Sequence, residues 1–422
     1  MLDRTVAPKS GAINTPDLLQ PNQLIFDNLS SVYMIQAGDQ PVVKLEIVVR
    51  SGIWTEPQAR LSWITAKLLT EGCQTKNSNQ IAELFEYYGS FVEINPGFDS
   101  TSIVFYTPKK FFEPVTELMA EILFSPAFST REIEILKTKK IQELRVNLEK
   151  NSFLATRKIR ESLFGLDHPY GSALSIEDVE LLGRESIVNY FESGFYQSPE
   201  FFLSGDVSET EFAILKKFFD LQLNNQPIAQ NNFVQNDTIG DLFEEKEKSV
   251  QSSIRIGWLI PGKKNEDHFK LKITNELLGG YFSSRLMKNL REEKGYTYGV
   301  HSYPVFLRKG SFLIISTDVI AESTENSITE IQKEVELLKN EAVDAEELQT
   351  VKNYMAGSFL SDISSPFQIM DKFKSIHNHG LEYDYYDSFF HALKSTTPED
   401  VMACANHFLE TAKMHRAVVG KK

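Results

Sequence analysis

Hydrophobic and polar residues alternate along this chain with the periods of strands and helices, in two successive series. The first series opens at Val42–Val49, an apolar run typical of a buried strand. Leu61, Ile64 and Leu68 then recur at helical spacing, after a proline that suits a first helical turn and before Gly72, which can end a helix. The series predicts strands at 42–49, 91–94 and 101–107, and helices at 57–71, 78–88, 110–123 and 129–150.

The second series repeats the order of the first. It predicts strands at 254–260, 296–302 and 311–318, and helices at 266–279, 282–294, 322–340 and 344–360. Gly89 and Gly295, which each close a predicted helix, lie 206 residues apart, and Leu45 and Ile254 in the opening strands lie 209 apart. A near-constant offset over a whole unit indicates duplication. We expect an α+β fold of two tandem homologous domains, each a mainly antiparallel sheet with helices packed on one face.

Segments without periodicity mark the limits of these domains. Residues 1–24 contain three prolines and are predicted as an extended N-terminal arm. The stretch 221–248 is poor in large apolar residues and rich in turn formers, so it is the predicted linker. The expected domains are therefore 25–230 and 231–422.

The composition is that of an ordinary globular protein. The chain has 422 residues, of which 41% are hydrophobic and 24% charged, with a formal net charge of −14. This acidic balance disfavours nucleic acid or an anionic membrane as a partner and is compatible with basic peptides. Cys73 and Cys404 cannot build a disulfide framework, and neither a membrane-spanning stretch nor a signal peptide is apparent. We expect a cytoplasmic protein, with the periplasm as the alternative.

The most specific segment is Leu277–Ser302, which reads LLGGYFSSRLMKNLREEKGYTYGVHS. Its parts LLGG, SSRL, LREEKG and YTYGV stand in an order and spacing that resemble the C-terminal-half signature of the pitrilysin, insulinase and mitochondrial-processing-peptidase family of zinc proteases. The resemblance extends from residue 22 onward through length, duplication and element order. It implies that Arg291 and Tyr298, seven residues apart, match the family's arginine and tyrosine that reach the scissile carbonyl.

The zinc helix of that family, H-x-x-E-H, is missing from the sequence. Histidines one helical turn apart bind one ion, and the glutamate between them activates its water. In the matching helix Trp63 and Lys67 occupy the histidine positions, and Ala66 occupies the glutamate position. Tryptophan offers only a donor, and protonated lysine repels zinc. The family's third ligand, a glutamate, falls on Leu144, one residue from Glu143, so we predict no metal site in this chain.

The histidines elsewhere lack partners at ligand spacing. His377 and His379 stand two residues apart, which places them on different faces of a helix, and they are expected to be exposed at a helix end. His168, in HPYG, resembles a common loop of the family and is expected to make a turn contact.

The resemblance also implies a chemistry for the second half. Arg291 and Tyr298 would stabilise the oxyanion formed when water attacks a peptide carbonyl, but neither can generate the nucleophile. Gly279 and Gly280 resemble the glycine-containing turn before the family's cleft helix. They either contact the substrate or form an ordinary helix–helix turn. Arg285 is either a second substrate contact or a surface cation.

The leading hypothesis is a non-zinc subunit of a heteromeric metallopeptidase, inactive alone and without a cofactor of its own. Its expected partners are a homologous subunit that carries zinc in H-x-x-E-H and a peptide substrate, and a homodimer is possible when that subunit is absent. The alternatives are a catalytically silent structural subunit, a peptide-binding module that grips extended peptides by strand addition, and a peptidase with unrecognised metal ligands.

Overall fold

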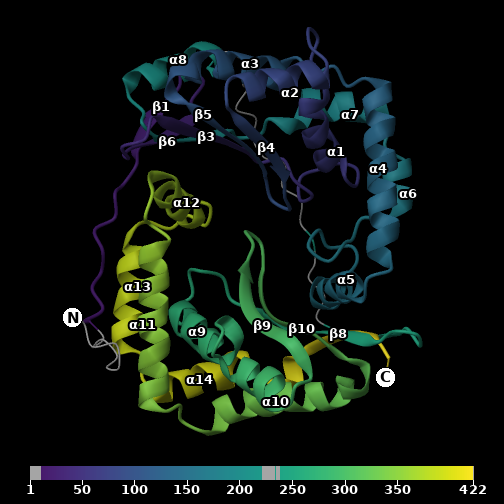
Figure 1. Cartoon of the computed structure of the whole chain (residues 1–422), viewed down its shortest axis with the longest axis vertical. Helices are drawn as coiled ribbons and strands as arrows, with labels where there is room; N and C mark the ends of the chain where they lie inside the picture. The colour runs from purple at the N-terminus through teal and green to yellow at the C-terminus, as the bar shows by residue number, and fades with distance from the viewer. Residues whose placement is uncertain (1–10, 221–232, 234–237, 422) are drawn as a thin grey trace, which may run out of the picture.

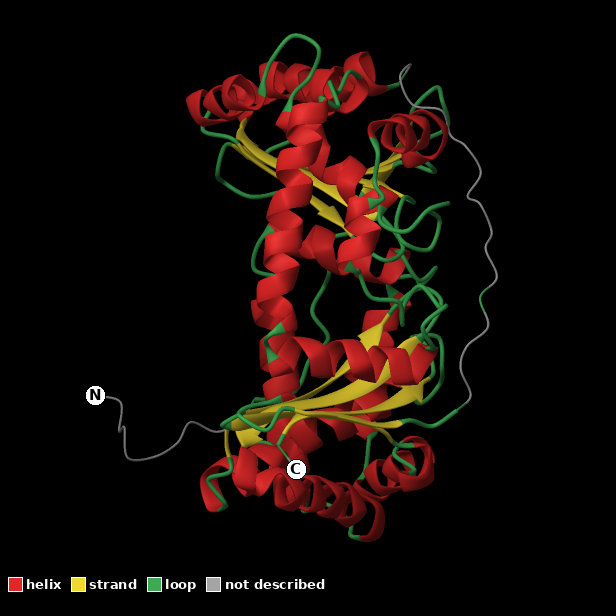
Figure 2. Ribbon diagram, turned by 90° about the vertical axis from the view of Figure 1, so that its right-hand side faces the viewer, coloured by secondary structure: helices red, strands yellow, loops and turns green. Residues whose placement is uncertain are grey.

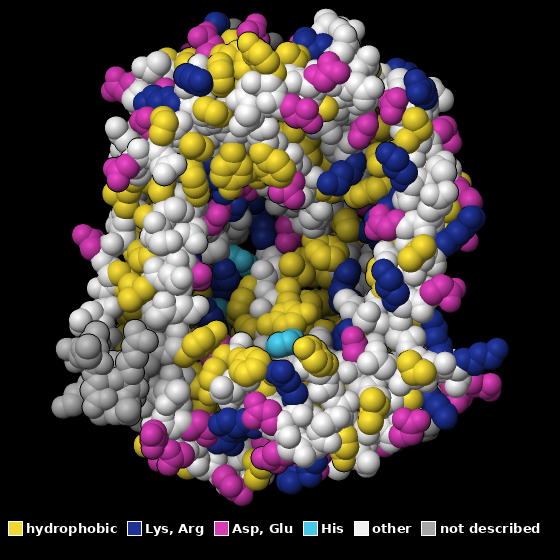
Figure 3. Space-filling view, in the orientation of Figure 1, with side chains coloured by type: hydrophobic (Ala, Val, Ile, Leu, Met, Phe, Trp, Pro, Cys, Tyr) yellow, Lys and Arg dark blue, Asp and Glu magenta, His cyan; other side chains and the backbone are white. Residues whose placement is uncertain are grey.

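The chain has two halves, each built on one β-sheet (Figure 1), and the surface is hollowed between them (Figure 3). This computed structural model describes residues 11–220, 233 and 238–421. Both halves follow the predicted order of strand, helices, two strands and two helices. The order runs from β3 (Val42–Val49) to α4 (Thr130–Leu148) and from β8 (Gln251–Ile260) to α11 (Ala345–Ser361). The predicted α+β fold with two tandem sheets is confirmed.

The first half contains a six-stranded sheet. Its other strands are β1 (Asn22–Ile25), β2 (Ser31–Gln36), β4 (Phe91–Pro96), β5 (Thr101–Pro108) and β6 (Glu200–Gly205). The spatial order is β1-β2-β6-β3-β5-β4, and all neighbouring pairs are antiparallel except β2 and β6, which are parallel. Side chains of β5 alternate between buried and half-buried positions, as the two faces of a pleated strand require. β4 is an edge strand.

Helices of the first half pack on one face of this sheet. Leu45, Leu203 and Phe105 of the sheet share a buried cluster with Ile64 and Met119 of the helices, and burial of such apolar surface is the main stabilising contribution. The helical elements are α1 (Leu61–Leu68), η1 (Leu69–Glu71), α2 (Ser78–Tyr87), η2 (Lys109–Phe111), α3 (Phe112–Phe124), α6 (Ile176–Glu180), α7 (Arg184–Tyr190), η3 (Phe191–Phe195) and α8 (Glu209–Phe219), besides α4.

The second half has a five-stranded sheet and its own set of helices. Its other strands are β7 (Asp241–Glu245), β9 (Thr297–Phe306), β10 (Ser311–Ile320) and β11 (His415–Gly420). The order is β7-β11-β8-β10-β9, with only β7 and β11 parallel, and β9 at one edge. The helical elements are α9 (His268–Asn275), η4 (Glu276–Gly280), η5 (Met287–Glu293), η6 (Ala321–Ser323), α10 (Thr324–Asn340), α13 (Asp384–Ser395), α14 (Pro398–Phe408) and η7 (Thr411–Lys413), besides α11.

The two halves exchange one helix each, which the sequence did not predict. Helix α12 (Pro366–His377) of the second half lies on β2 and β6, and α5 (Asn151–Phe164), which follows α4 along one side of the molecule, lies on β8 and β11 (Figure 2). Successive residues of a strand point to opposite faces of its sheet. The strand residues that contact α5 and α12 alternate with those that contact each half's own helices. Helices α5 and α12 therefore cover the face of each sheet that its own helices leave open. The contacts pair Tyr33, Ile35 and Phe202 with Met370 and Phe373, and Phe312, Ile314 and Ala417 with Ile159 and Leu163.

The predicted helix at 57–71 begins later than expected, at Leu61. Arg60 adopts a left-handed backbone with φ of 71°, which breaks helical continuity on the N-terminal side. The Glu56 carboxylate accepts hydrogen bonds from the backbone N–H groups of Arg60 and Ser62, at 2.6 and 3.0 Å. Pro57 therefore lies in the loop that caps α1, before the helix begins, and not in its first turn.

The arm and the linker also differ from the prediction. The last three residues of the predicted arm, 22–24, belong to β1, and residues 241–245 of the predicted linker form β7, which pairs with β11. The proposed boundary at residue 230 lies outside the described residues, so the domain limits stay a prediction. Among the described helices, none combines the length and the apolar character that crossing a bilayer demands.

Candidate functional site

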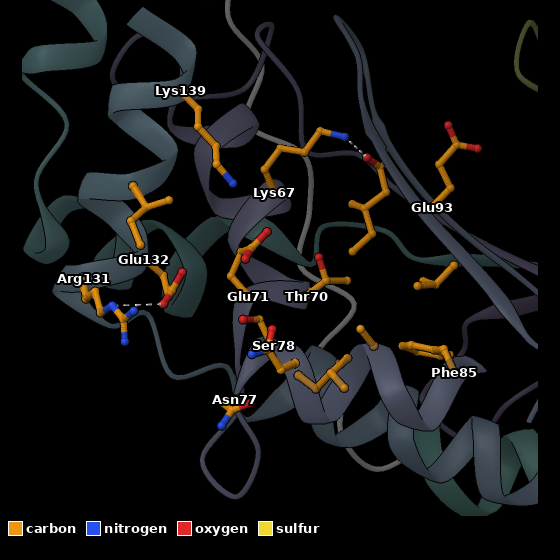
Figure 4. A pocket seen from close by; sticks show the side chains of 16 residues that line it. Lys67, Thr70, Glu71, Asn77, Ser78, Phe85, Glu93, Arg131, Glu132 and Lys139 are labelled. Carbon is orange, nitrogen blue, oxygen red and sulfur yellow. Dashed lines mark hydrogen bonds and ion pairs between the residues drawn. The ribbon is translucent and has the colours of Figure 1, made fainter. Parts of the chain in front are cut away.

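The part of α1 where the family's zinc helix falls is committed to internal contacts. Lys67 crosses to the edge strand β4, where its ammonium donates a hydrogen bond to the Ile94 carbonyl at 2.6 Å (Figure 4). Trp63 is half-buried with the Lys140 ammonium 5.3 Å from its ring centre, and Ala66 is fully buried. Burial lowers the pKa of Lys67. Two cations and an indole therefore stand where zinc ligands would be needed.

The third ligand position is also unsuitable. Leu144 on α4 is buried at 3% exposure, whereas the neighbouring Glu143 pairs with Lys140 at 3.0 Å on the outer side of the helix. If the third ligand position is moved by one residue, from Leu144 to Glu143, it falls on a glutamate that already forms an ion pair with Lys140. Within the described residues no cluster of histidine, cysteine, aspartate and glutamate is arranged to hold a metal ion.

A hollow of about 750 Å³ lies beside Lys67, between α1, α2, β4 and α4 (Figure 4). Carboxylates and ammonium groups share its lining: Glu71 and Glu132 on one hand, Lys67 and Lys139 on the other. Burial, and then the nearby charge of Glu132, raise the pKa of Glu71. The residues that line this hollow carry mixed charge and, as described, form no cluster of metal ligands.

In the second half, Arg291 and Tyr298 lie side by side. Arg291 belongs to η5, a π-helical turn, and Tyr298 to the edge strand β9. The guanidinium carbon lies 5.5 Å from the centre of the Tyr298 ring and 4.9 Å from that of Phe282. Tyr298 is 91% exposed and Phe282 is 64% exposed. The guanidinium is therefore held against two rings by cation–π attraction, and no carboxylate among the described residues forms an ion pair with it.

A β-bulge sets the direction of Tyr298. Thr297 pairs with Val319 while Val300 pairs with Thr317, so β9 carries one more residue here than β10. The Thr317 hydroxyl donates to the Gly299 carbonyl at 3.0 Å, and the Thr297 hydroxyl donates to the backbone of β10 at 2.7 Å. Bulges commonly re-aim a side chain beside a functional site. This one directs the phenol to solvent while its backbone stays satisfied.

Gly279, Gly280 and Arg285 have contacts of their own inside the fold. A Cβ at Gly279 would lie 2.6 Å from the Ser302 hydroxyl oxygen, and one at Gly280 would lie 2.6 Å from the Glu276 carboxylate. Gly279 therefore permits η4 to pack closely on β9, and Gly280 leaves room for the Glu276 side chain within η4. The Arg285 guanidinium donates to both carboxylate oxygens of Glu347, at 3.0 and 2.7 Å. A role of these residues in substrate binding stays a prediction.

The histidines form structural contacts. His168 is buried, and its Nδ1 accepts the Tyr170 backbone N–H at 3.1 Å, which is the predicted turn contact. His377 is not the exposed residue that was expected, because its Nε2 lies 2.6 Å from the Glu200 carboxylate across the junction of α12 with the first sheet. His379 is half-buried. The prediction of exposure failed because the exchange of α12 was not foreseen.

Comparison with known proteins agrees with this picture. Residues 197–355 match the family described as the peptidase M16 inactive domain. The chain is an M16-like peptidase homologue. It is 22% identical to the "uncharacterized zinc protease YmxG" of Bacillus subtilis over 79% of this chain and 84% of that protein. It is 21% identical to the "non-peptidase homolog YmxG" of Helicobacter pylori, over 71% and 70%, and 20% identical to the "probable inactive metalloprotease YmfF" of B. subtilis, over 68% of each.

Solved structures of M16-like proteins share the fold. An M16 inactive domain from Pseudomonas fluorescens superposes with a TM-score of 0.86 at 22% identity, over 96% of this chain and 99% of that one. The periplasmic protease PqqL of Escherichia coli gives 0.77 at 14% identity, over all of this chain and 48% of PqqL. Without the H-x-x-E-H residues, this M16-like chain is incomplete as a peptidase on its own.

Three features of the site were not found from the sequence. Phe282, which stacks on Arg291, lay inside the signature segment but carried no signal of its role. The bulge at Tyr298 was hinted at only by the following glycine, a residue often found in bulged strands. The bond from Lys67 to β4 depends on packing between distant elements, which periodicity does not reveal.

Proposed function

We propose that this M16-like chain is the non-zinc subunit of a two-chain metallopeptidase and presents Arg291 and Tyr298 to a peptide held against its partner. The observation that carries the proposal is the exposed Tyr298 on the β9 bulge, with the Arg291 guanidinium of η5 5.5 Å from its ring. An arginine and a tyrosine that are held in place yet unused within the chain are available to a second molecule.

The pair would act on the carbonyl of the bound peptide. The phenol O–H and the guanidinium N–H groups are donors, and donors aimed at a developing oxyanion stabilise the transition state. The planar guanidinium also offers further donors to the peptide backbone. Neither group produces the attacking hydroxide, and α1 offers a lysine and a tryptophan in place of ligands. The zinc and its water therefore belong, in this proposal, to a partner subunit with H-x-x-E-H.

A second candidate function rests on the sheet edges. β4 and β9 each have one neighbour, and β4 borders the hollow beside Lys67. Edge strands expose unpaired backbone groups to which an extended peptide can add as a further strand. A peptide-binding module without proteolysis would use these edges and would not need the phenol of Tyr298.

Reconstitution separates the candidates. The purified chain is mixed with a homologous subunit that contains H-x-x-E-H, and cleavage of a quenched fluorescent peptide library is followed. We expect cleavage only in the mixture, abolished by a chelator and restored by zinc, together with a complex in size-exclusion chromatography. A stable complex without any cleavage would favour a structural or peptide-binding subunit instead.

A metal-free state of this chain and a homodimer formed without the partner belong to the same proposal. The cytoplasmic location inferred from the sequence remains a prediction, because the structurally similar PqqL is described as periplasmic.

A further inference from the structure

A small pocket in the second half carries a set of side chains that the proposed function does not use. Its volume is about 340 Å³, within the range of small-molecule sites. It lies where α9, α11, α12 and α13 meet the far end of β9, roughly 25 Å along the strand from Tyr298. The lining consists of lysines, aromatic rings and two small residues: Lys263, Lys272, Lys372, Phe306, Phe359, Phe389, Tyr385, Tyr386, Pro304 and Ser375.

Of the three lysines that line the pocket, only one forms an ion pair with a described carboxylate. Lys372 is paired with Asp362 at 2.9 Å. Lys263 donates to the Ser375 carbonyl at 2.8 Å, and Lys272 contacts the Phe389 ring at 5.2 Å; neither forms an ion pair with a described carboxylate. Burial, reinforced by repulsion among these ammonium groups, lowers the pKa of both Lys263 and Lys272 to about 8. At neutral pH they remain mostly charged, so a bound anion would relieve the repulsion.

The aromatic rings give the pocket an apolar wall beside these charges. Lys263 lies 5.9 Å from the Phe306 ring and Lys372 lies 5.0 Å from the Phe359 ring. The Tyr385 hydroxyl is held by the buried His268, whose Nε2 lies 2.7 Å away. Burial lowers the pKa of His268 to about 3, so it stays neutral and adds no charge. A simple phosphate would leave this wall without a contact, whereas an apolar body would fill it.

We propose that this pocket binds a carboxylate attached to an apolar body the size of one amino-acid side chain. The carboxylate would lie between Lys263 and Lys272, where it accepts charge-assisted hydrogen bonds, and the apolar body would pack on Phe306, Phe359 and Phe389. A free small acid and the C-terminal residue of a peptide share this chemistry. Lys263 also lines the neighbouring hollow formed by residues 260–265, 307–311 and 377–380. Lys and Arg side chains are gathered around the central hollow (Figure 3).

Calorimetry with the full chain tests the site directly. N-acetyl-L-phenylalanine is titrated beside its uncharged amide, inorganic phosphate, and a short peptide that ends in phenylalanine as the acid or the amide. We expect saturable binding of the acid at one site and at least tenfold weaker binding of the amide and of phosphate. If both N-acetyl-L-phenylalanine and the peptide acid bind, the site accepts the C-terminus of a peptide. If only N-acetyl-L-phenylalanine binds, the site accepts free small acids.

Variants assign the binding to the pocket. Lys272→Met keeps the length and apolar stem of the side chain, and should weaken the acid about tenfold or more, the scale of one charged hydrogen bond. Lys263→Met should act similarly, and serves if Lys272→Met fails to fold. Lys394→Met alters an exposed lysine of α13, outside the pocket, and should leave binding unchanged. Equal binding of acid and amide, or full affinity in folded Lys272→Met and Lys263→Met, would overturn the proposal. Neither result depends on a zinc-bearing partner.

Discussion

The zinc position of the first half and the Arg291–Tyr298 pair of the second half differ in how far their side chains are used within the fold. The zinc position lies on α1, the first helix after β3, and the pair lies on η5 and β9. In the first, every side chain that replaces a catalytic group has an internal partner: Lys67 bonds β4, Trp63 lies by Lys140, and Ala66 is buried. In the second, the phenol and the guanidinium contact each other and solvent. The side chains at the first site make structural contacts within the chain, whereas those at the second site remain accessible to another molecule.

The energetic reasoning behind this contrast is simple. A side chain that contributes to packing or to a buried hydrogen bond is retained for stability. An aromatic ring that is 91% exposed contributes little to stability, and its bulge interrupts a regular ladder. Stability of the isolated chain therefore explains the residues at the first site, whereas the residues at the second site are better explained by contact with another molecule.

The largest effect is expected from Ala66→Glu, which restores the family's catalytic glutamate. Ala66 is fully buried in α1, so the carboxylate would be left in the core without zinc or a partner. We expect a loss of about 3–5 kcal/mol in the free energy of unfolding, the scale of an unpaired buried charge. Urea denaturation measures it. Ala82→Glu, at an exposed position of α2, should change stability by less than about 0.5 kcal/mol. A tolerated Ala66→Glu would mean that the first site is still open.

The second prediction concerns catalysis by the reconstituted pair. Tyr298→Phe removes one hydroxyl from a side chain that is already exposed, so folding and assembly should be unaffected. We expect kcat to fall about 100-fold, because one oxyanion donor is lost. Arg291→Ala should reduce kcat as well and should also raise KM, since it removes donors for the peptide backbone.

Tyr303→Phe provides the matched control for this experiment. Tyr303 lies on the same edge strand and is 47% exposed, outside the bulge. Its variant should retain full activity. If Tyr298→Phe behaves in the same way, the exposed pair has no catalytic role, and a structural subunit becomes the better interpretation.

The sequence predicted local elements better than contacts between the halves. Val42–Val49 followed from its continuous apolar run, and the helix at 78–88 followed from its helical periodicity, because both signals are local to the segment. Helix α12 looks amphipathic in the sequence, but nothing local shows that it packs on Tyr33 and Phe202, more than 160 residues away. For the same reason the Arg291–Tyr298 pair could be located from its motif, whereas the lysine pocket, assembled from five elements, could not.

A third prediction concerns the junction that holds the two sites in one body. Glu200 on β6 bonds His377 of α12 at 2.6 Å and Arg50 at 2.5 Å. Burial alone would raise the pKa of Glu200, but the bond from His377 and the charge of Arg50 hold it below its ordinary value. The pair therefore stabilises the fold above the unfolded-state pKa of a glutamate, and this stabilisation is lost as the pH falls through the lower folded pKa.

Glu200→Gln should cost about 2 kcal/mol near neutral pH, the scale of a hydrogen bond to a charged group. The difference between variant and wild type should shrink as the pH falls below about 4.5, where Glu200 of the unfolded chain takes up a proton, and should vanish once the pH has passed the lower pKa of the folded state. Thermal unfolding at a series of pH values measures it. A difference that stays constant down to pH 3 would show that the ionised form of Glu200 does not carry the effect.

The smallest expected effect separates packing from function at the glycines before η5. A methyl group at Gly279 would lie 2.6 Å from the Ser302 hydroxyl oxygen and 2.9 Å from its backbone nitrogen, so η4 must shift away from β9. We expect Gly279→Ala to cost about 1–2 kcal/mol, within the range for overpacking. Gly357→Ala, in α11 with no atom within 4 Å of the added carbon, should instead stabilise the chain by about 0.5–1 kcal/mol. Urea denaturation compares the two. If Gly279→Ala is as stable as wild type but the reconstituted enzyme loses activity, Gly279 contacts the peptide, and the substrate-binding role predicted from the sequence would replace the packing explanation.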